Sequence, residues 1–374
     1  MGTISPGLVS YFLVLSDPRV LKRSRHKLID ILVIAVSAVI CGARGWEDIE
    51  IWGNQREQWL KTFLELPNGI ASHDTFARVF SILDPVSFEK CFSLWARSMR
   101  KNLHGELIGI DGKTVRRSFD GATGKSAIHV VSAWMSERGI SLGQEKVKDK
   151  SNEISAVPKL LDKLNIEGTT ITADAMNTQT AIIAKVVERK ADYVFCVKAN
   201  QPTLHNEIKN LFLACEKGGF QGVNHHYFET TDKGHGRIEI RKYWQTDHLV
   251  SIESKGNWKG LSSIGMVQSE RIIGENRTQE TRYFISSLEL DGEAFSRAVR
   301  SHWSIENSLH WCLDVSFEED SCRIRVKNAA ENFSLLRKIA INLLKKELSE
   351  RRSLKQKSKI AAWNNEYLIT VLVG

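Results

Sequence analysis

Two acidic residues stand where a site for chemistry could form. Asp111 follows the apolar run Leu107-Ile-Gly-Ile110, and Asp174 follows Thr170-Ile-Thr-Ala173. An acid at the carboxyl end of a buried strand costs desolvation free energy unless a cation or a hydrogen-bond donor meets it. Sites in α/β proteins assemble at that end of the sheet. The pair therefore indicates a cation-binding site, although Asp also serves as a turn or helix-cap residue at such positions.

A third acid, Glu306, belongs to a polar stripe with helical periodicity. The members of this stripe recur every four residues, which places them on one face of a helix: His302, Glu306, His310 and Asp314. One interpretation is an amphipathic helix whose histidines contact neighbouring helices. Another is a zinc site, but the spacing lacks the adjacent His-Glu pair of the H-E-x-x-H motif. The stripe alone leaves the role of Glu306 open.

Composition limits the class of protein that can hold these acids. The chain has 374 residues, 42% of them hydrophobic and 26% charged, as in ordinary globular proteins. Its net charge of +8 favours a polyanionic partner such as nucleic acid. The six cysteines form no C-x-x-C pair, which argues against a zinc knuckle or a disulfide framework. The start of the chain does not read as a secretion signal, and the apolar run 31–42 is too short to span a bilayer, so we expect a cytoplasmic protein without membrane contact.

The first 100 residues predict a small all-α domain that could bind DNA. Asp30 to Cys41 reads as a buried helix, and Glu47 to Phe63 carries aromatic and aliphatic residues at helical spacing. A further helix opens at His73, with Ser72 or Asp74 as its cap, and Asp84-Pro85 begins another.

Beyond residue 100 the pattern changes to α/β. The expected strands lie at 107–110, 127–134, 139–147, 169–173 and 193–197, with helices at 153–164 and 178–190. Strands in series followed by alternating helices and strands describe a mixed five-stranded sheet flanked by helices, which matches the ribonuclease-H-like fold. We expect a catalytic domain over 101–340 with a β-rich insertion at about 205–280, a long helix from Gly292 through Glu306, and a basic tail over 341–374.

Several sequence blocks resemble one family. Ile110-Asp-Gly-Lys-Thr-Val-Arg116, Thr172-Ala-Asp-Ala175 and His302-Trp-Ser-Ile-Glu-Asn307 look like the three catalytic blocks of the H-repeat-associated insertion-sequence transposases, which belong to the DDE superfamily. Further blocks in the same order are similar to that family, among them 68–75, 198–201 and 235–241. The wider insertion-sequence pattern places Tyr, Arg and Lys around the glutamate, where this chain has Val299, His302 and Leu313. The H-repeat group shares the His-Trp variant.

The resemblance implies a reaction and a set of roles. The resemblance implies that Asp111, Asp174 and Glu306 are the catalytic residues and that they hold two Mg²⁺ ions, with Asp111 bridging the two ions. Mn²⁺ can substitute for Mg²⁺. The enzyme would cut the ends of an insertion sequence and join the freed 3′-hydroxyl to target DNA, as a homodimer on double-stranded DNA. His302, Asn307 and His310 become auxiliary residues. The alternatives are a transposase-derived DNA-binding protein without activity, and a ribonuclease-H-like nuclease of repair or recombination.

Basic residues near these blocks are expected to contact DNA phosphates. They follow the first aspartate, end the fifth strand or alternate on the inserted strands: Lys113, Arg116 and Arg117; Lys198 and Gln201; His235, Arg237 and Arg241. Alternation places the last three on one face of a strand. The competing interpretation is an ordinary solvated surface.

Overall fold

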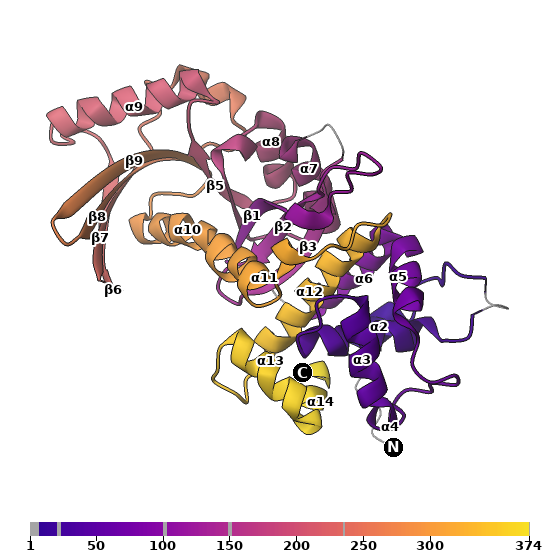
Figure 1. Cartoon of the computed structure of the whole chain (residues 1–374). Helices are drawn as coiled ribbons and strands as arrows, with labels where there is room; N and C mark the ends of the chain where they lie inside the picture. Colours follow the sequence, from indigo (N-terminus) through magenta and orange to yellow (C-terminus); the bar gives the residue numbers. More distant parts are fainter. Residues whose placement is uncertain (1–6, 21–23, 100–102, 149–151, 235, 374) are drawn as a thin grey trace. The chain divides into compact units, whose positions relative to one another are not determined.

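The computed structural model describes the chain except for residues 1–6, 21–23, 100–102, 149–151, 235 and 374 (Figure 1). The chain divides into two compact units. Unit 1 comprises Met1–Lys101, Gly112–Asn152 and Glu306–Gly374, and unit 2 comprises Asn102–Asp111 and Glu153–Ile305. Each unit is discontinuous in sequence. The domain boundaries predicted near residues 100 and 340 stay a prediction, because this division follows compactness alone.

Helices make up most of unit 1. They are α1 (Leu8–Phe12), α2 (Leu28–Ile40), α3 (Trp46–Gln55), α4 (Glu57–Leu60), α5 (His73–Ile82), α6 (Pro85–Ser98), α11 (Trp311–Val315), α12 (Ala329–Lys346), α13 (Leu354–Trp363) and α14 (Asn365–Val373). The helices predicted for the first 100 residues are therefore present. Pro85 begins α6, and the Asp84 carboxylate accepts a hydrogen bond from the Ser87 amide, so the sequence signal and the cap coincide. Within the described residues, no helix is both long and apolar enough to cross a membrane.

A hairpin completes unit 1. Strands β2 (His129–Met135) and β3 (Ile140–Lys146) pair antiparallel. The turn between them includes Gly139 at φ +68°, a conformation that favours glycine. Helix α12 packs on β3, where the Asn342 side chain accepts from the Ser141 amide and donates to its carbonyl, both at 2.8 Å. This paired contact fixes the buried helix to the strand.

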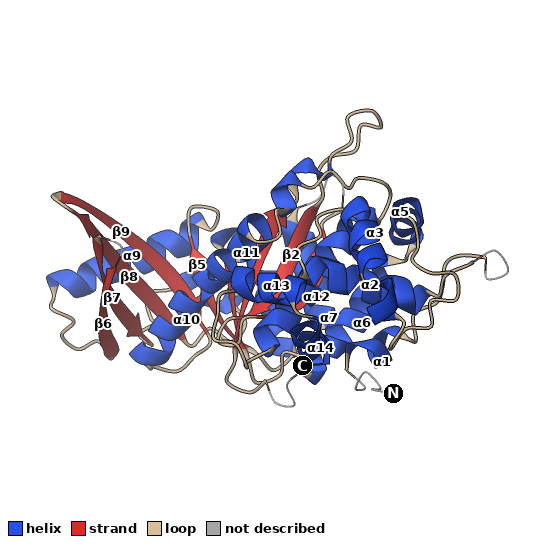
Figure 2. Cartoon of the chain, turned by 60° about the horizontal axis from the view of Figure 1, so that its bottom comes forward, coloured by secondary structure: helices blue, strands red, loops and turns tan. Residues whose placement is uncertain are grey.

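Unit 2 is built on a mixed sheet (Figure 2). Its strands are β1 (Leu107–Thr114, up to Asp111 in this unit), β4 (Thr170–Ala173), β5 (Asp192–Val197), β6 (His225–Gly234), β7 (Arg237–Thr246), β8 (Ser263–Ile273) and β9 (Asn276–Ser286). They are ordered β1-β4-β5-β9-β8-β7-β6. The first three are parallel, whereas β9 joins β5 antiparallel. The mixed α/β class is confirmed, but five strands are not. The strands of the predicted insertion extend the same sheet because β9 pairs with β5.

Helices lie on both faces of this sheet. They are α7 (Glu153–Lys163), α8 (Thr180–Glu188), α9 (Pro202–Lys217) and α10 (Gly292–Ser304). Tyr283 and Phe284 are neighbours on β9 and therefore point to opposite faces. Tyr283 stacks on Phe212 of α9, and Phe284 meets Phe295 of α10 edge to face. Helices α9 and α10 thus cover opposite faces of the long strands (Figure 1).

The predicted long helix around Glu306 is interrupted. Helix α10 ends at Ser304, and residues Ile305–His310 form a π-helix before α11 begins. A π-helix bonds i to i+5 and holds more residues per turn than an α-helix, so a four-residue spacing falls slightly short of a full turn there instead of slightly beyond it. The change of helix type does not contradict the polar stripe from His302 to Asp314, which stays a prediction.

Candidate active site

Asp111 and Asp174 are placed by two neighbouring parallel strands. Ile110 of β1 is in register with Ala173 of β4, so the next residue of each chain segment is an aspartate at the same level of the sheet. Adjacent strands lie about 4.8 Å apart. Asp111 lies inside β1, which continues to Thr114, and is 9% exposed. Asp174 leaves β4 and precedes a short 3₁₀ turn (Ala175–Asn177), with its side chain half exposed. The two predicted aspartates of unit 2 are thus brought together.

His302 of α10 contacts the second aspartate. Its Nε2 lies 3.2 Å from Oδ1 of Asp174, and its Nδ1 lies 3.4 Å from Oγ1 of Thr172. Thr172 and Asp174 alternate along β4, so both side chains face α10. The hydrogen bond from His302 is the main reason why the pKa of Asp174 lies below its ordinary value, despite partial burial that opposes the shift. Asp174 is therefore a charged carboxylate with one oxygen held in place.

Positive charge gathers around Asp174. Lys198 and Arg282 both add to the lowering of its pKa. Val197 is in register with Tyr283, which explains how Lys198, after β5, comes near Arg282 on β9. The Arg282 guanidinium donates twice to Glu280 and lies 4.7 Å from the centre of the Trp303 ring. Sequence reasoning selected Lys198 but missed Arg282, because only the pairing of β5 with β9 reveals it.

Glu306 begins the last of the three segments of unit 1. Its neighbour Ile305 still belongs to unit 2 and lies over β1, where a Cβ built at Gly109 would be 3.6 Å from the Ile305 Cβ. Glu306 is half-buried within the π-helix and Asn307 is exposed. Burial, with Lys338 and Lys113 nearby, lowers the pKa of His310 to about 3, so this ring is neutral. The meeting of Glu306 with the two aspartates stays a prediction.

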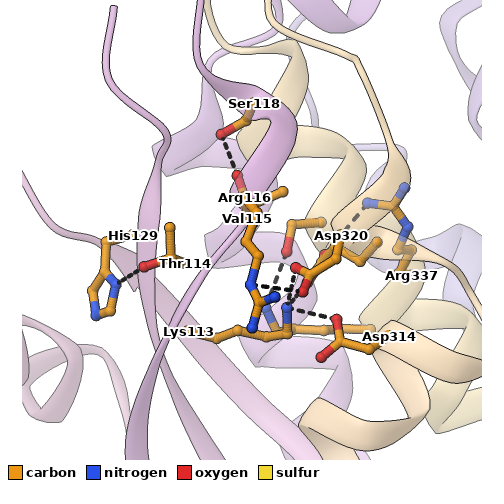
Figure 3. A network of polar contacts seen from close by, with 12 residues as sticks. Lys113, Thr114, Val115, Arg116, Ser118, His129, Asp314, Asp320 and Arg337 are labelled. Atoms are coloured by element: carbon orange, nitrogen blue, oxygen red, sulfur yellow. Dashed lines mark hydrogen bonds and ion pairs between the residues drawn. The ribbon is translucent and has the colours of Figure 1, made fainter.

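Lys113 lies in a cluster of acids within unit 1 (Figure 3). Its Nζ is 2.7 Å from Asp314 Oδ1, 2.9 Å from Asp320 Oδ1 and 3.6 Å from Glu319 Oε2, and its side chain is 11% exposed. Burial by itself would lower the pKa of Lys113, but the surrounding carboxylates raise it. The expected phosphate contact does not fit this arrangement, because the ammonium group is already enclosed by acids.

The other predicted DNA contacts have varied surroundings. Arg116 is exposed and pairs with Asp320 at 3.1 Å, whereas Arg117 is exposed without an ion pair among the described residues. Gln201 donates to the Thr178 carbonyl at 3.0 Å.

The predicted basic stripe on the inserted strands is also neutralised in part. Arg237 pairs with Glu239 at 3.1 Å, and Arg241 pairs with both Glu239 and Asp232. Position 239 shares the face of 237 and 241, so the acid lies between the two cations. His235 lies outside the described residues. The stripe is therefore a mixed ionic surface.

The chemistry of the paired aspartates fits a hard cation. Among the described residues, no group of three or more His, Cys, Asp or Glu side chains is assembled closely enough to hold a metal ion. Asp111 and Asp174 offer carboxylate oxygens, the ligands that Mg²⁺ and Mn²⁺ prefer. The low pKa of Asp174 keeps its carboxylate ionised, as a metal ligand must be.

Comparison with known proteins identifies the family of the chain. The family model "Transposase DDE domain" matches residues 80–343, and the model "DDE_Tnp_1-associated" matches residues 9–96. The chain is 42% identical to "Putative transposase YncI" of Escherichia coli O157:H7, over 98% of this chain and 94% of that protein. It is 41% identical to "H repeat-associated putative transposase YhhI" of Escherichia coli K12, over 98% of each. A piggyBac transposase synaptic complex with hairpin DNA aligns with a TM-score of 0.46 and 10% identity, over 96% of this chain and 78% of that one. The chain belongs to the H-repeat-associated family of DDE transposases.

Proposed function

We propose that this protein is the DNA transposase of an insertion sequence, which cuts the element's ends and joins the freed 3′-hydroxyl to target DNA. Asp111, Asp174 and Glu306 would be its catalytic residues and metal ligands, within a ribonuclease-H-like catalytic domain. The observation that carries the proposal is the parallel register of β1 and β4, which sets Asp111 beside Asp174. Since two element ends must be joined, the protein would act at least as a homodimer on DNA.

The residues around the aspartates suit phosphoryl transfer. Two Mg²⁺ ions, when bound, would stabilise the attacking and leaving oxygens of an in-line displacement. Asp111 would hold both ions, Asp174 one and Glu306 the other. His302 keeps Asp174 in a fixed orientation by its hydrogen bond. Lys198 is exposed and close enough to Asp174 to help lower its pKa, so it can receive a phosphate of the cleaved strand next to the carboxylates.

Cleavage of DNA that carries the terminal repeats flanking the gene tests this proposal. The purified full chain is incubated with that DNA in Mg²⁺ or in EDTA, and nicked and joined products are scored. We expect products in Mg²⁺ alone. Asp111→Asn should abolish them while DNA binding persists, because a carboxylate ligand is lost and the side-chain shape is kept.

A matched control uses the other end of the sheet. Asp192 begins β5 at its amino end, where its carboxylate accepts from the Ser287 hydroxyl at 2.8 Å. Asp192→Asn changes the same charge away from the proposed site and should cleave like the wild type. Full cleavage by Asp111→Asn refutes the assignment. Binding without cleavage by the wild type would favour the alternative, a transposase-derived DNA-binding protein.

A further inference from the structure

A basic segment of unit 1 is built as a fixed surface. Residues Ser321–Asn328, here called the strap, connect a 3₁₀ turn (Glu319–Ser321) to α12. The strap carries Arg323, Arg325 and Lys327, at every second position of a stretch that begins in extended conformation at Cys322. Arg323 and Lys327 are exposed. The sequence analysis did not predict a ligand contact for any residue of the strap.

The main chain of the strap is held from two sides. Lys125, in the loop after β1, donates to the carbonyl oxygen of Arg325 at 2.5 Å and to that of Lys327 at 3.0 Å. At the other side, Asn328 donates from its amide to the Ser81 carbonyl at 3.3 Å. Lys327 has φ +44°, a conformation that non-glycine residues keep only where their surroundings impose it. The cations therefore stand on a fixed backbone, so binding costs little main-chain entropy.

The cations of the strap are not neutralised by carboxylates of the described residues. Among the described residues, no ion pair involves Arg323, Arg325 or Lys327. The Arg325 guanidinium lies 5.3 Å from the ring centre of Phe119, and its shielded Nε has no hydrogen-bond partner in the described part of the chain. No carboxylate of the described residues therefore neutralises these three cations.

An open hollow of about 490 Å³ adjoins the strap. Its lining includes Arg323, Arg325 and Val326 of the strap, Trp46 of α3 and one acid, Asp120. The Asp120 carboxylate accepts hydrogen bonds within its own loop, from the Ala122 amide at 3.2 Å and the Thr123 hydroxyl at 2.9 Å. The hollow thus offers an anion two arginines and little opposing charge.

We propose that the strap is a phosphate-binding surface for the backbone of duplex DNA, through Arg323, Arg325 and Lys327. The ligand class rests on the proposed function, which makes DNA the substrate. Fixed cations that contact phosphates position a duplex without reading its sequence. The strap would therefore add affinity for any duplex and leave sequence preference unchanged.

The test measures how DNA affinity depends on salt. The full chain in EDTA is titrated onto a fluorescein-labelled duplex of arbitrary sequence, and anisotropy gives the dissociation constant between about 50 and 200 mM salt. The strap variant is Arg323→Gln, Arg325→Gln and Lys327→Gln in one chain. Each phosphate contact contributes about 0.9 to the slope of log affinity against log salt, so the variant's slope should be about 2.7 smaller. Over this fourfold range, the wild type should lose about 40-fold more affinity than the variant.

The matched control removes the same charge elsewhere. Lys90, Lys209 and Lys217 are exposed, and Lys90→Gln, Lys209→Gln and Lys217→Gln together should keep the wild-type slope. Arg323→Gln alone should lower the slope by about 0.9, which covers the case in which the triple variant does not fold. The proposal is overturned if the strap variant keeps the wild-type slope. It is also overturned if the slope of the control variant decreases as much as that of the strap variant.

Failure of this proposal differs from failure of the proposed function. A wild type that cleaves DNA, with a strap variant of unchanged slope, overturns only the strap. A wild type that binds through the strap but never cleaves overturns only the catalytic assignment. A wild type that does not bind duplex DNA overturns both.

Discussion

Replacement of Lys113 by methionine should destabilise the protein strongly. The variant keeps an unbranched side chain of similar length and removes the charge that Asp314, Glu319 and Asp320 surround at 2.7, 3.6 and 2.9 Å. Removing one partner of a buried ion pair costs about 3–5 kcal/mol, because the remaining charge is left without compensation. Here two cations stay: Arg337 at 3.3 Å from Glu319 and Arg116 at 3.1 Å from Asp320.

Solvent reduces the expected loss further, since the Asp314 side chain is 35% exposed and water can reach it. We therefore expect Lys113→Met to lower the free energy of unfolding by about 2–3 kcal/mol at neutral pH. Urea unfolding, followed by circular dichroism at an unchanged m-value, measures this difference. The control is Lys61→Met, which breaks an exposed i,i+4 pair with Glu57 and should cost about 0.3–0.5 kcal/mol.

The pH dependence has a definite sign. Burial raises the pKa of Glu319 on its own, but Arg337, Lys338 and Lys113 together hold it below the ordinary value of 4.5. Its stabilising contribution is present above pH 4.5 and is lost as pH falls through the lower pKa of the folded state. The difference between wild type and Lys113→Met should therefore shrink in acid. If Lys113→Met lowered the free energy of unfolding by less than about 0.5 kcal/mol at neutral pH and also weakened DNA binding, this reasoning would be refuted. Lys113 would then be a phosphate contact, as the sequence predicted.

Three further substitutions test other parts of the structure. His302→Ala removes the hydrogen bond that chiefly lowers the pKa of Asp174, which should then titrate closer to 3.8, as carboxyl-carbon NMR can measure. Burial lowers the pKa of Lys338 to about 8 from 10.5, so the unfolded state binds more protons than the folded state between these two pH values. The free energy of unfolding of the wild type should therefore rise by about 3 kcal/mol over this range, and urea unfolding of Lys338→Met should show no such rise. Gly265→Ala places a Cβ 2.1 Å from the buried Phe295 ring and should lower the free energy of unfolding by about 1–3 kcal/mol. Thermal melts measure this loss, and a variant that melts like the wild type would contradict the close packing of Gly265 against Phe295.

Local sequence signals were enough to locate the elements that carry the aspartates. Apolar runs bounded by turns predicted β1, β4 and β5 to within a few residues, because burial of a short strand leaves its mark on consecutive residues. The Asp84-Pro85 start of α6 was equally readable, since a cap depends on only a few neighbouring residues. Both aspartates of unit 2 followed from these strands.

Long-range pairing was the part that sequence could not supply. Lys113 meets its acids far along the chain, and nothing near Lys113 distinguishes it from a solvated lysine. Arg282 comes near Lys198 only because β9 pairs with β5. The π-helix over 305–310 also escaped prediction, because a change of helical hydrogen bonding leaves no mark in the periodicity of so short a segment. The sequence also did not predict that β6–β9 join the main sheet, because that too depends on the pairing of β9 with β5.

The π-helix also divides the proposed ligands by how firmly their main chain is held. Asp111 lies within a strand whose ladder hydrogen bonds fix the backbone on the β4 side. Glu306 lies on a turn whose i→i+5 bonding is rarer and less regular than that of the α-helices on either side. Such a turn opens at lower free energy than a packed α-helix or a central strand. Backbone amides of residues 305–310 should thus exchange with solvent faster than those of α10 or β1, which would make the main chain of Glu306 more adaptable than that of Asp111 among the three proposed ligands.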